Sequence, residues 1–276
     1  MVQNESLQYR FRDGLFLCQI ITICKDAAHT KSVNHLKWDE LLSILVCDFF
    51  SSGDSPFEWA NTFLCSAARQ GCLPMIKILF TKASKEPDLA KALVAETQVD
   101  SPYQSVGEAA FWGHADIVQY LLTQKHVDIT PHLHHHTTRD RRNVLHCAAS
   151  SKNAEILRIL AERLPSGVEE QSTEGDTPLQ LLTFGHHASV EAVRALVDVG
   201  KADVNSCPGG TYFSPLRTAI RAKNVEVCRL LVRYGAYIDD ALQRDAGSGE
   251  IGLADDLGDA GSSQRILEIL LPLSQL

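Results

Sequence analysis

Most of the chain alternates between short apolar stretches with helical spacing and polar breaks. Apolar residues at positions i, i+3, i+4 and i+7 form one face of an amphipathic helix, and this spacing recurs in pairs of stretches between residues 62 and 232. The first stretch of a pair is rich in alanine and the second carries bulky aliphatic side chains, as in residues 104–122, QSVGEAAFWGHADIVQYLL. The pattern predicts an all-α protein built from pairs of short antiparallel helices.

These helix pairs form an internal repeat. Its copies begin at residues 62, 104, 143, 177 and 214, so the spacings are 42, 39, 34 and 37 residues. No single copy can bury its apolar face alone. We therefore expect neighbouring copies to stack and share a continuous core.

Local signals predict where the helices begin and end. Thr62 and Thr177 are placed to open first helices, because a threonine hydroxyl accepts hydrogen bonds from the free amide groups of a first turn. Pro178 then falls at the first helical position, where a missing N–H group is tolerated. Gly200 and Gly235 are expected to end second helices as left-handed C-caps.

The repeats resemble the ankyrin repeat, whose signature is TPLHxAA, then GH, a second helix and a closing GADVN. The fourth copy matches most fully, with TPL at 177–179 and GKADVN at 200–205, and the second copy supplies GH at 113–114. The resemblance covers residues 58–240 and implies an ankyrin-repeat solenoid of about five repeats. It also implies that His146, at the histidine position of TPLH, braces the hairpin through hydrogen bonds.

The repeats divide the chain into three regions. Residues 1–56 carry helical patterns without the repeat signature and are expected to form an N-terminal helical cap or extension. Residues 57–240 hold five repeats with long inserts at 81–103 and 123–142, because the first two spacings exceed the family's usual repeat of about 33 residues. Residues 241–276 are expected to form a C-terminal capping repeat.

Composition and charge narrow the classes of function. The 276 residues carry a net charge of −8, which argues against a general nucleic-acid binder, since that needs a basic face. The apolar run 15–24 is half the length of a membrane span and no signal-peptide cleavage site follows it. The eight cysteines form no CxxC pair, as expected for reduced thiols. We expect a monomeric, intracellular protein, cytoplasmic or nuclear, that binds neither nucleic acid nor membrane.

Three patterns that could carry chemistry have simpler explanations. The GxGxxG at 247–252 follows no predicted strand, so we interpret it as a loop rather than a dinucleotide site. Cys147 lies on an alanine-rich helix and is expected to be buried rather than nucleophilic. A histidine-rich insert holds His132, His134, His135 and His136. No acidic or cysteine partner there has metal-ligand spacing, so we predict no metal, cofactor or catalytic residue.

The resemblance to ankyrin repeats implies contact positions for a partner in a concave groove. They lie just before each first helix and at its last residues. The positions before the helices are Trp59, Asn61, Tyr103, Arg139, Asp140, Arg142, Thr173, Glu174, Asp176 and Phe213. The helix-end positions are Arg69, Gln70, Phe111, Trp112, Ser150, Ser151, Phe184 and Arg221.

The second copy has two aromatics, Phe111 and Trp112, where the first and third copies have polar residues. Aromatics beside an arginine are typical of binding hot spots. We therefore favour a protein–protein interaction module or scaffold, centred on the second and third repeats, over an enzyme. In an alternative explanation, Phe111 and Trp112 pack beneath the insert 123–142 or the N-terminal helices.

A second alternative is a small-molecule-binding or enzymatic ankyrin protein. Its pocket would lie between the groove and the histidine-rich insert, where His134 or His136 would converge with Arg142 or Asp140. A third is that the chain is a fragment of a larger ankyrin protein.

Overall fold

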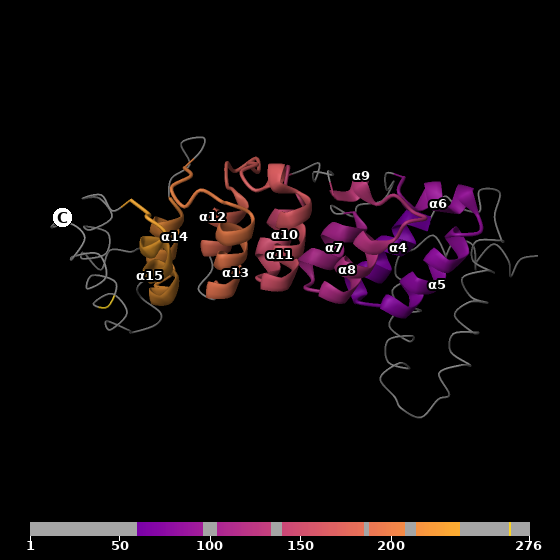
Figure 1. Cartoon of the computed structure of the whole chain (residues 1–276), viewed down its shortest axis with the longest axis horizontal. Coiled ribbons are helices and arrows are strands. Elements are labelled where there is room, and N and C mark those ends of the chain that lie inside the picture. The colour runs from indigo at the N-terminus through magenta and orange to yellow at the C-terminus, as the bar shows by residue number, and fades with distance from the viewer. Residues whose placement is uncertain are drawn as a thin grey trace, which may run out of the picture. The chain divides into compact units, whose positions relative to one another are not determined.

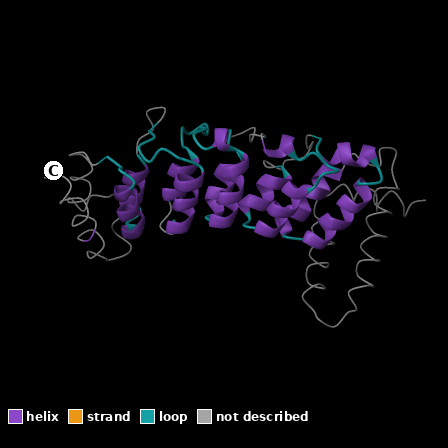
Figure 2. Ribbon diagram, in the orientation of Figure 1, coloured by secondary structure: helices purple, strands orange, loops and turns teal. Residues whose placement is uncertain are grey.

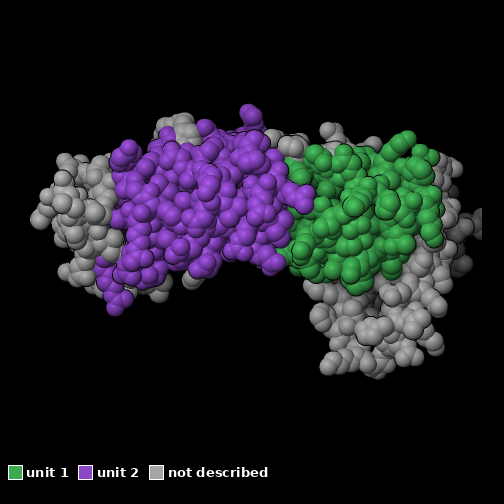
Figure 3. Space-filling view, viewed as in Figure 1, with its two compact units in different colours: residues 1–135 green, residues 136–276 purple. Residues whose placement is uncertain are grey.

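The computed structural model describes residues 60–95, 104–133, 140–184, 188–207, 214–237 and 265. Helices joined by turns make up this part of the chain, and it contains no strand (Figure 1 and Figure 2). The prediction of an all-α fold is confirmed. The chain divides into two compact units, residues 1–135 and residues 136–276 (Figure 3). The predicted caps at 1–56 and 241–276 lie outside the described residues, apart from Arg265.

The described residues of the first unit form two helix pairs, α4 (Ala60–Gln70) with α5 (Leu73–Ala83) and α7 (Ser105–Phe111) with α8 (Ala115–Thr123). The first helices α4 and α7 pack against each other. They bury small side chains, namely Ala67, Ala68, Ala109 and Ala110, whereas the second helices bury Met75, Ile76, Leu79, Ile117, Val118 and Leu121. The small side chains let the first helices approach closely, and the bulky ones fill the core behind them.

Both inserts of the first unit contain helices that fold back onto the repeats. Helix α6 (Pro87–Leu93) packs against α4 and α5, and helix α9 (Thr130–Leu133) packs against α7. Apolar side chains from both inserts are buried, namely Leu89, Leu93, Val127, Ile129 and Leu133. Helix α5 runs to Ala83, three residues beyond the end of the predicted repeat. The inserts therefore add helices that pack against the helices of the repeats.

Buried hydrogen bonds fasten the inserts in place. The amide group of Asn61 donates to the carbonyl oxygen of Ala95, at the end of the first insert, and to Gln104 Oε1 at 2.8 Å. Ser105 Oγ lies 2.8 Å from His132 Nδ1 of the second insert, and both residues are buried. Breaking such a bond would leave a buried polar group without a partner, which costs about 1–3 kcal/mol.

Three helix pairs lie in the part of the second unit that the structure describes. They are α10 (Val144–Ser151) with α11 (Ala154–Arg163), α12 (Pro178–Thr183) with α13 (Val190–Arg194), and α14 (Pro215–Arg221) with α15 (Val225–Arg233). A short 3₁₀ helix, η1 (Pro165–Gly167), follows α11, and a π-helical turn, η2 (Ala195–Val199), continues α13. The first helices α10, α12 and α14 pack in chain order, and α11 packs against α13 and η2. The predicted stacking is confirmed within each unit.

The helix starts confirm one predicted cap and correct another. Thr177 Oγ1 accepts from the amide of Gln180, Gln180 Oε1 accepts from the amide of Thr177, and Pro178 follows at the first helical position. The Thr177 cap and the place of Pro178 are as predicted, and the return bond from Gln180 completes a capping box. Thr62, in contrast, lies inside α4, which begins at Ala60. The prediction was wrong because burial of Ala60 and Asn61 against the rest of the unit extends the helix.

The two glycines predicted as left-handed C-caps differ. Gly235 has a φ of 84°, which confirms the prediction. Gly200 has a φ of −72°, and the next residue, Lys201, takes the left-handed conformation with a φ of 59°. Position 200 still requires glycine, because a Cβ atom there would lie 2.7 Å from the carbonyl oxygen of Leu196. Close packing, rather than backbone conformation, selects this glycine.

Candidate functional site

The predicted helix-end contact positions lie directly before the turn that joins the two helices of a repeat. In four repeats the turn contains a left-handed residue, namely Gly71, Gly113, Lys152 or Lys223, with φ between 52° and 80°. The side chains just before this turn therefore occupy equivalent positions in these repeats. The second repeat is the one that places two aromatics there.

Trp112 is the C-cap residue of α7 and is 54% exposed. Phe111 is half-buried, and the two rings meet edge to face with centroids 5.6 Å apart. Helix α9 of the insert packs near Ser105, at the other end of α7. Seven helical residues separate Ser105 from Trp112, or about 10 Å. Helix α9 thus lies toward the end of α7 opposite to Trp112.

A buried carboxylate links this position to the preceding repeat. Nε and Nη2 of Arg69, at the end of α4, donate to Glu108 Oε2 and Oε1 at 3.0 and 2.7 Å. The Glu108 side chain is 1% exposed and that of Arg69 is 40% exposed. A bidentate, charge-assisted contact of this kind fixes the guanidinium group in one orientation. Glu108 and Trp112 are four residues apart at the end of α7, so they lie on the same face of the helix.

The sequence did not single out Glu108. An acidic residue inside an alanine-rich, buried first helix was the available signal, since such a residue is rarely buried without a partner. Its partner lies 39 residues earlier. No helical spacing connects the two positions, so the sequence could not have named the pair.

The turn of the first repeat is covered by a histidine from the second. Nε2 of His114 donates to the carbonyl oxygen of Arg69 at 3.1 Å. A Cβ atom at Gly71 would lie 2.6 Å from the ring carbon Cε1 of His114. Gly71 is therefore required both by its φ of 75° and by this close approach.

The buried thiols have no environment that would activate them. Burial, reinforced by the nearby Glu108 charge, raises the pKa of the Cys65 thiol well above its ordinary value. Burial also raises the pKa of Cys228 to about 12. Cys147 is buried as predicted. Since the thiolate is the nucleophile, burial disfavours the reactive form of Cys65 and Cys228.

In the second unit, predicted contact residues that precede the first helices lie near His146, the histidine expected to brace the hairpin. Nε2 of His146 donates to the carbonyl oxygen of Asp176 at 2.9 Å, which confirms the bracing role. Asp140 is half-buried and its carbonyl oxygen accepts from the amide of Thr173 at 2.8 Å. Arg142 is half-buried. Burial raises the pKa of the Asp176 carboxyl, while the positive charge of Arg142 lowers it.

The helix-end residues of the second unit differ in exposure. Phe184, the C-cap residue of α12, is 69% exposed, and Arg221, at the end of α14, is half-buried. The two serines of the third repeat hydrogen-bond to their own helix, Ser150 Oγ to the carbonyl of His146 and Ser151 Oγ to that of Ala148. Phe184 is thus a large exposed apolar side chain of this unit at a predicted contact position.

Asn61 differs from the other described members of the predicted set, because its side chain is buried and hydrogen-bonded. It braces the repeat and offers no surface to a partner. Gln70 is half-buried at the end of α4. Six predicted site residues lie outside the described residues, namely Trp59, Tyr103, His134, His136, Arg139 and Phe213. The GxGxxG segment 247–252 also lies outside them.

The described residues contain no group of three or more His, Cys, Asp or Glu side chains arranged to hold a metal ion. None of the described helices is both long enough and apolar enough to traverse a bilayer.

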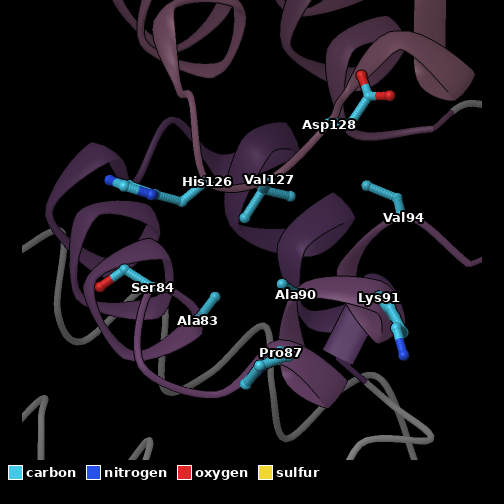
Figure 4. A pocket seen from close by; sticks show the side chains of 9 residues that line it. All are labelled: Ala83, Ser84, Pro87, Ala90, Lys91, Val94, His126, Val127 and Asp128. Carbon is cyan, nitrogen blue, oxygen red and sulfur yellow. The ribbon is translucent and has the colours of Figure 1, made fainter.

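A cleft of about 380 Å³ lies in the first unit, between the two inserts (Figure 4). Its walls are the end of α5, helix α6 and residues 126–128. It is not the predicted pocket, because His134 and His136 are not among its lining residues. We call it the insert cleft.

Comparison with known families gives one match. A family model described as ankyrin repeats, in three copies, matches residues 106–207 and, in an overlapping second match, residues 145–241. No curated protein matches the chain. The matched residues include α7 to α15, and they begin just after the first insert, so α4, α5 and α6 lie outside the match.

Proposed function

Because this chain belongs to the ankyrin-repeat family, we propose that it is a protein–protein interaction module that binds a partner at the ends of its first helices. Ankyrin repeats generally mediate protein–protein interaction. The proposed contact residues of the first unit are Arg69, Gln70, Phe111 and Trp112, which we call the aromatic patch. On the second unit they are Asp140, Arg142, Phe184 and Arg221.

The exposure of Trp112 is the observation that carries this proposal. A tryptophan buries a large apolar area at a low cost in side-chain entropy, which is why it is enriched among binding hot spots. At 54% exposed, Trp112 retains much of this area for a partner. The turn does not require it, since serines occupy the equivalent position in the third repeat.

The ion pair gives the patch a second property. Arg69 is oriented by a buried carboxylate, so little side-chain entropy is lost when a partner contacts the guanidinium group. An oriented arginine and an exposed indole in one patch favour a partner that offers both an apolar side chain and a hydrogen-bond acceptor. The patch is therefore proposed to select its partner by both shape and polarity.

We also propose an intracellular location. Among the described residues the cysteines are thiols rather than disulfides, and four of the five are buried. Reduced thiols are typical of the cytosol and nucleus.

The decisive experiment is affinity capture followed by direct binding with the purified partner. Full-length protein and a Trp112→Ala variant are used as baits, and recovered proteins are quantified. We expect at least one partner to bind the variant with an affinity lower by about 2 kcal/mol, or roughly thirtyfold, the range of a binding hot spot. Thermal melting verifies that the variant is folded.

Tyr237→Ala serves as the matched control. Tyr237 is 77% exposed and lies outside the proposed contact set. It should leave the recovered partners unchanged. Equal recovery of every partner by wild type and Trp112→Ala would refute the proposed patch.

A further inference from the structure

The insert cleft has an apolar floor and a polar rim. Ala83, Pro87, Ala90, Val94 and Val127 supply the apolar lining. Figure 4 shows Val127 directed toward Ala90, whereas the tips of His126, Lys91 and Asp128 point away from it. Its volume of about 380 Å³ lies within the usual range for ligand sites. The cleft can therefore take an apolar side chain, with polar groups around its mouth.

The main chain beside the cleft has unused hydrogen-bonding capacity. Among the described residues, the N–H and C=O groups of Lys125, His126, Val127 and Asp128 make no hydrogen bond to another residue. Val127 is nevertheless only 2% exposed. Because buried main-chain groups are nearly always paired, the N–H and C=O groups of Val127 call for a further partner, either water or a ligand, whereas Lys125, His126 and Asp128 are exposed to solvent.

The rim carries charges of both signs, and its side-chain hydrogen-bond donors include Lys91 and His126. Asp128 is engaged within the chain, since its Oδ1 accepts from the amide of Thr130 at 3.0 Å. These hydrogen bonds to Thr130 lower the pKa of the Asp128 carboxyl. Lys91 is paired with Asp88 at 3.8 Å, but both side chains are 81% exposed, so this contact is weak. Lys91 and His126 can thus donate to an acidic group at the mouth.

We propose that the insert cleft binds a short linear peptide of a partner protein. An aliphatic side chain of the peptide enters between Val127 and Ala90, its main chain hydrogen-bonds to Val127 and Asp128, and an adjacent acidic residue faces Lys91 and His126. Main-chain pairing combined with a side-chain pocket is an established way of recognising peptides. The site uses other residues than the aromatic patch and does not depend on the proposed function.

The test measures binding of a defined peptide to the full-length protein by NMR. The probe is the acetylated, amidated tripeptide Ser-Leu-Glu, added to isotopically labelled protein. We expect a dissociation constant on the order of 1 mM, with the largest shifts at the amides of Val127 and Asp128 and at the methyl group of Ala90. Ser-Gly-Glu should bind about tenfold more weakly, because burial of a leucine side chain is lost. Ser-Leu-Lys should bind a few-fold more weakly at low salt.

Two variants on the same helix test the location. Ala90→Leu fills the cleft and should weaken Ser-Leu-Glu binding at least about tenfold by steric exclusion. Ala92→Leu is the matched control, since Ala92 is also half-buried on α6 but does not line the cleft. The Ala92→Leu variant should bind Ser-Leu-Glu like the wild type, as should Trp112→Ala.

Three results would overturn the proposal. They are no shift at Val127 and Asp128, equal binding of the leucine and glycine peptides, and unchanged binding by a folded Ala90→Leu variant. Equal binding of the two peptides would mean that the leucine side chain does not enter the cleft. If Ala90→Leu does not fold, the proposal is decided by the comparison of the leucine and glycine peptides and by which residues of the wild-type protein shift. Loss of partner binding on Trp112→Ala is a separate result, so failure of either proposal can be recognised.

Discussion

The turn between the two helices of a repeat is built differently in the two units. In the first unit the left-handed residue is glycine, Gly71 or Gly113, and neither Cys72 nor His114 after it provides a side-chain cap. In the second unit the left-handed residue of the third and fifth repeats is a lysine, and an asparagine follows it. Asn153 Oδ1 accepts from the amides of Glu155 and Ile156, and Asn224 Oδ1 accepts from that of Val227.

The same backbone geometry is thus reached in two ways. A left-handed lysine is strained relative to glycine, but the asparagine cap offsets this by about 1 kcal/mol. The first unit avoids the strain and uses the space above Gly71 for the ring of His114. The stack therefore requires the left-handed turn. The residues of the turn can vary, provided that a side-chain cap offsets any backbone strain.

The contacts between neighbouring first helices differ as well. In the first unit α4 and α7 are joined by the ion pair of Arg69 with Glu108, whereas in the second unit α12 and α14 are joined by the hydroxyl groups of Thr183 and Thr218. A buried carboxylate depends on its partner far more than a hydroxyl group does. The first unit should therefore be the more sensitive to loss of one side chain.

The largest effect is expected for Arg69→Leu. It leaves the carboxylate of Glu108 buried without its cation, so the free energy of unfolding should fall by about 3 kcal/mol. Urea denaturation measures this. Gln70→Leu, at the neighbouring half-buried position, is the control and should change stability by less than about 0.5 kcal/mol. A loss for Arg69→Leu no larger than for the control would contradict the role assigned to the ion pair.

Gly71→Ala should be the next most damaging change. It adds backbone strain and drives a Cβ atom into the ring of His114, so we expect a loss of about 2–3 kcal/mol. Gly113→Ala is its matched comparison, because Gly113 has a similar φ but no atom within 4 Å of the added Cβ. It should lose about 1 kcal/mol from strain alone. Equal losses would show that His114 yields to the added methyl group. Thermal melting of both variants gives the answer.

Removing a cap from the second unit should have a moderate effect. Asn153→Ala and Asn224→Ala should each lower the free energy of unfolding by about 1 kcal/mol, because amides at the start of α11 and α15 lose their acceptor. Ser206→Ala, in the part of the second unit outside these caps, is a suitable reference. If both asparagine variants melt like this reference, the proposed balance between cap and strain fails.

The smallest effect should be a gain. Lys152→Gly and Lys223→Gly relieve the left-handed strain, so each should raise stability by up to about 0.5 kcal/mol once the greater entropy of unfolded glycine is included. The reverse change, Gly113→Lys, should reduce stability, since His114 offers no side-chain cap. Urea denaturation of the three variants checks whether the turns of the two units are interchangeable.

Short-range signals made most of the fold predictable. Thr177 and Pro178 are neighbours in the chain, and they cap and open α12 as predicted. Thr62 failed because burial of the residues before it lengthened the helix. Gly200 failed because the packing against Leu196, and not the backbone conformation, accounts for it.

Less of the candidate site was predictable. The exposed aromatics Trp112 and Phe184 stand at positions that the sequence named, because their neighbours in other repeats are polar. The burial of Asn61, the pairing of Glu108 and the insert cleft were not foreseen. Each of them depends on which segments of the inserts or of the next repeat lie alongside.

The sequence by itself determined the repeated helix pairs and the all-α class and singled out position 112, because these follow from helical periodicity and from comparing equivalent positions; that Trp112 is exposed came from the structure. Only the tertiary structure decided that Arg69 is clamped by Glu108, that His114 covers Gly71, and that the inserts enclose a cleft. Those features join residues about forty positions apart. No local pattern specifies such contacts, and packing selects them when the repeats stack.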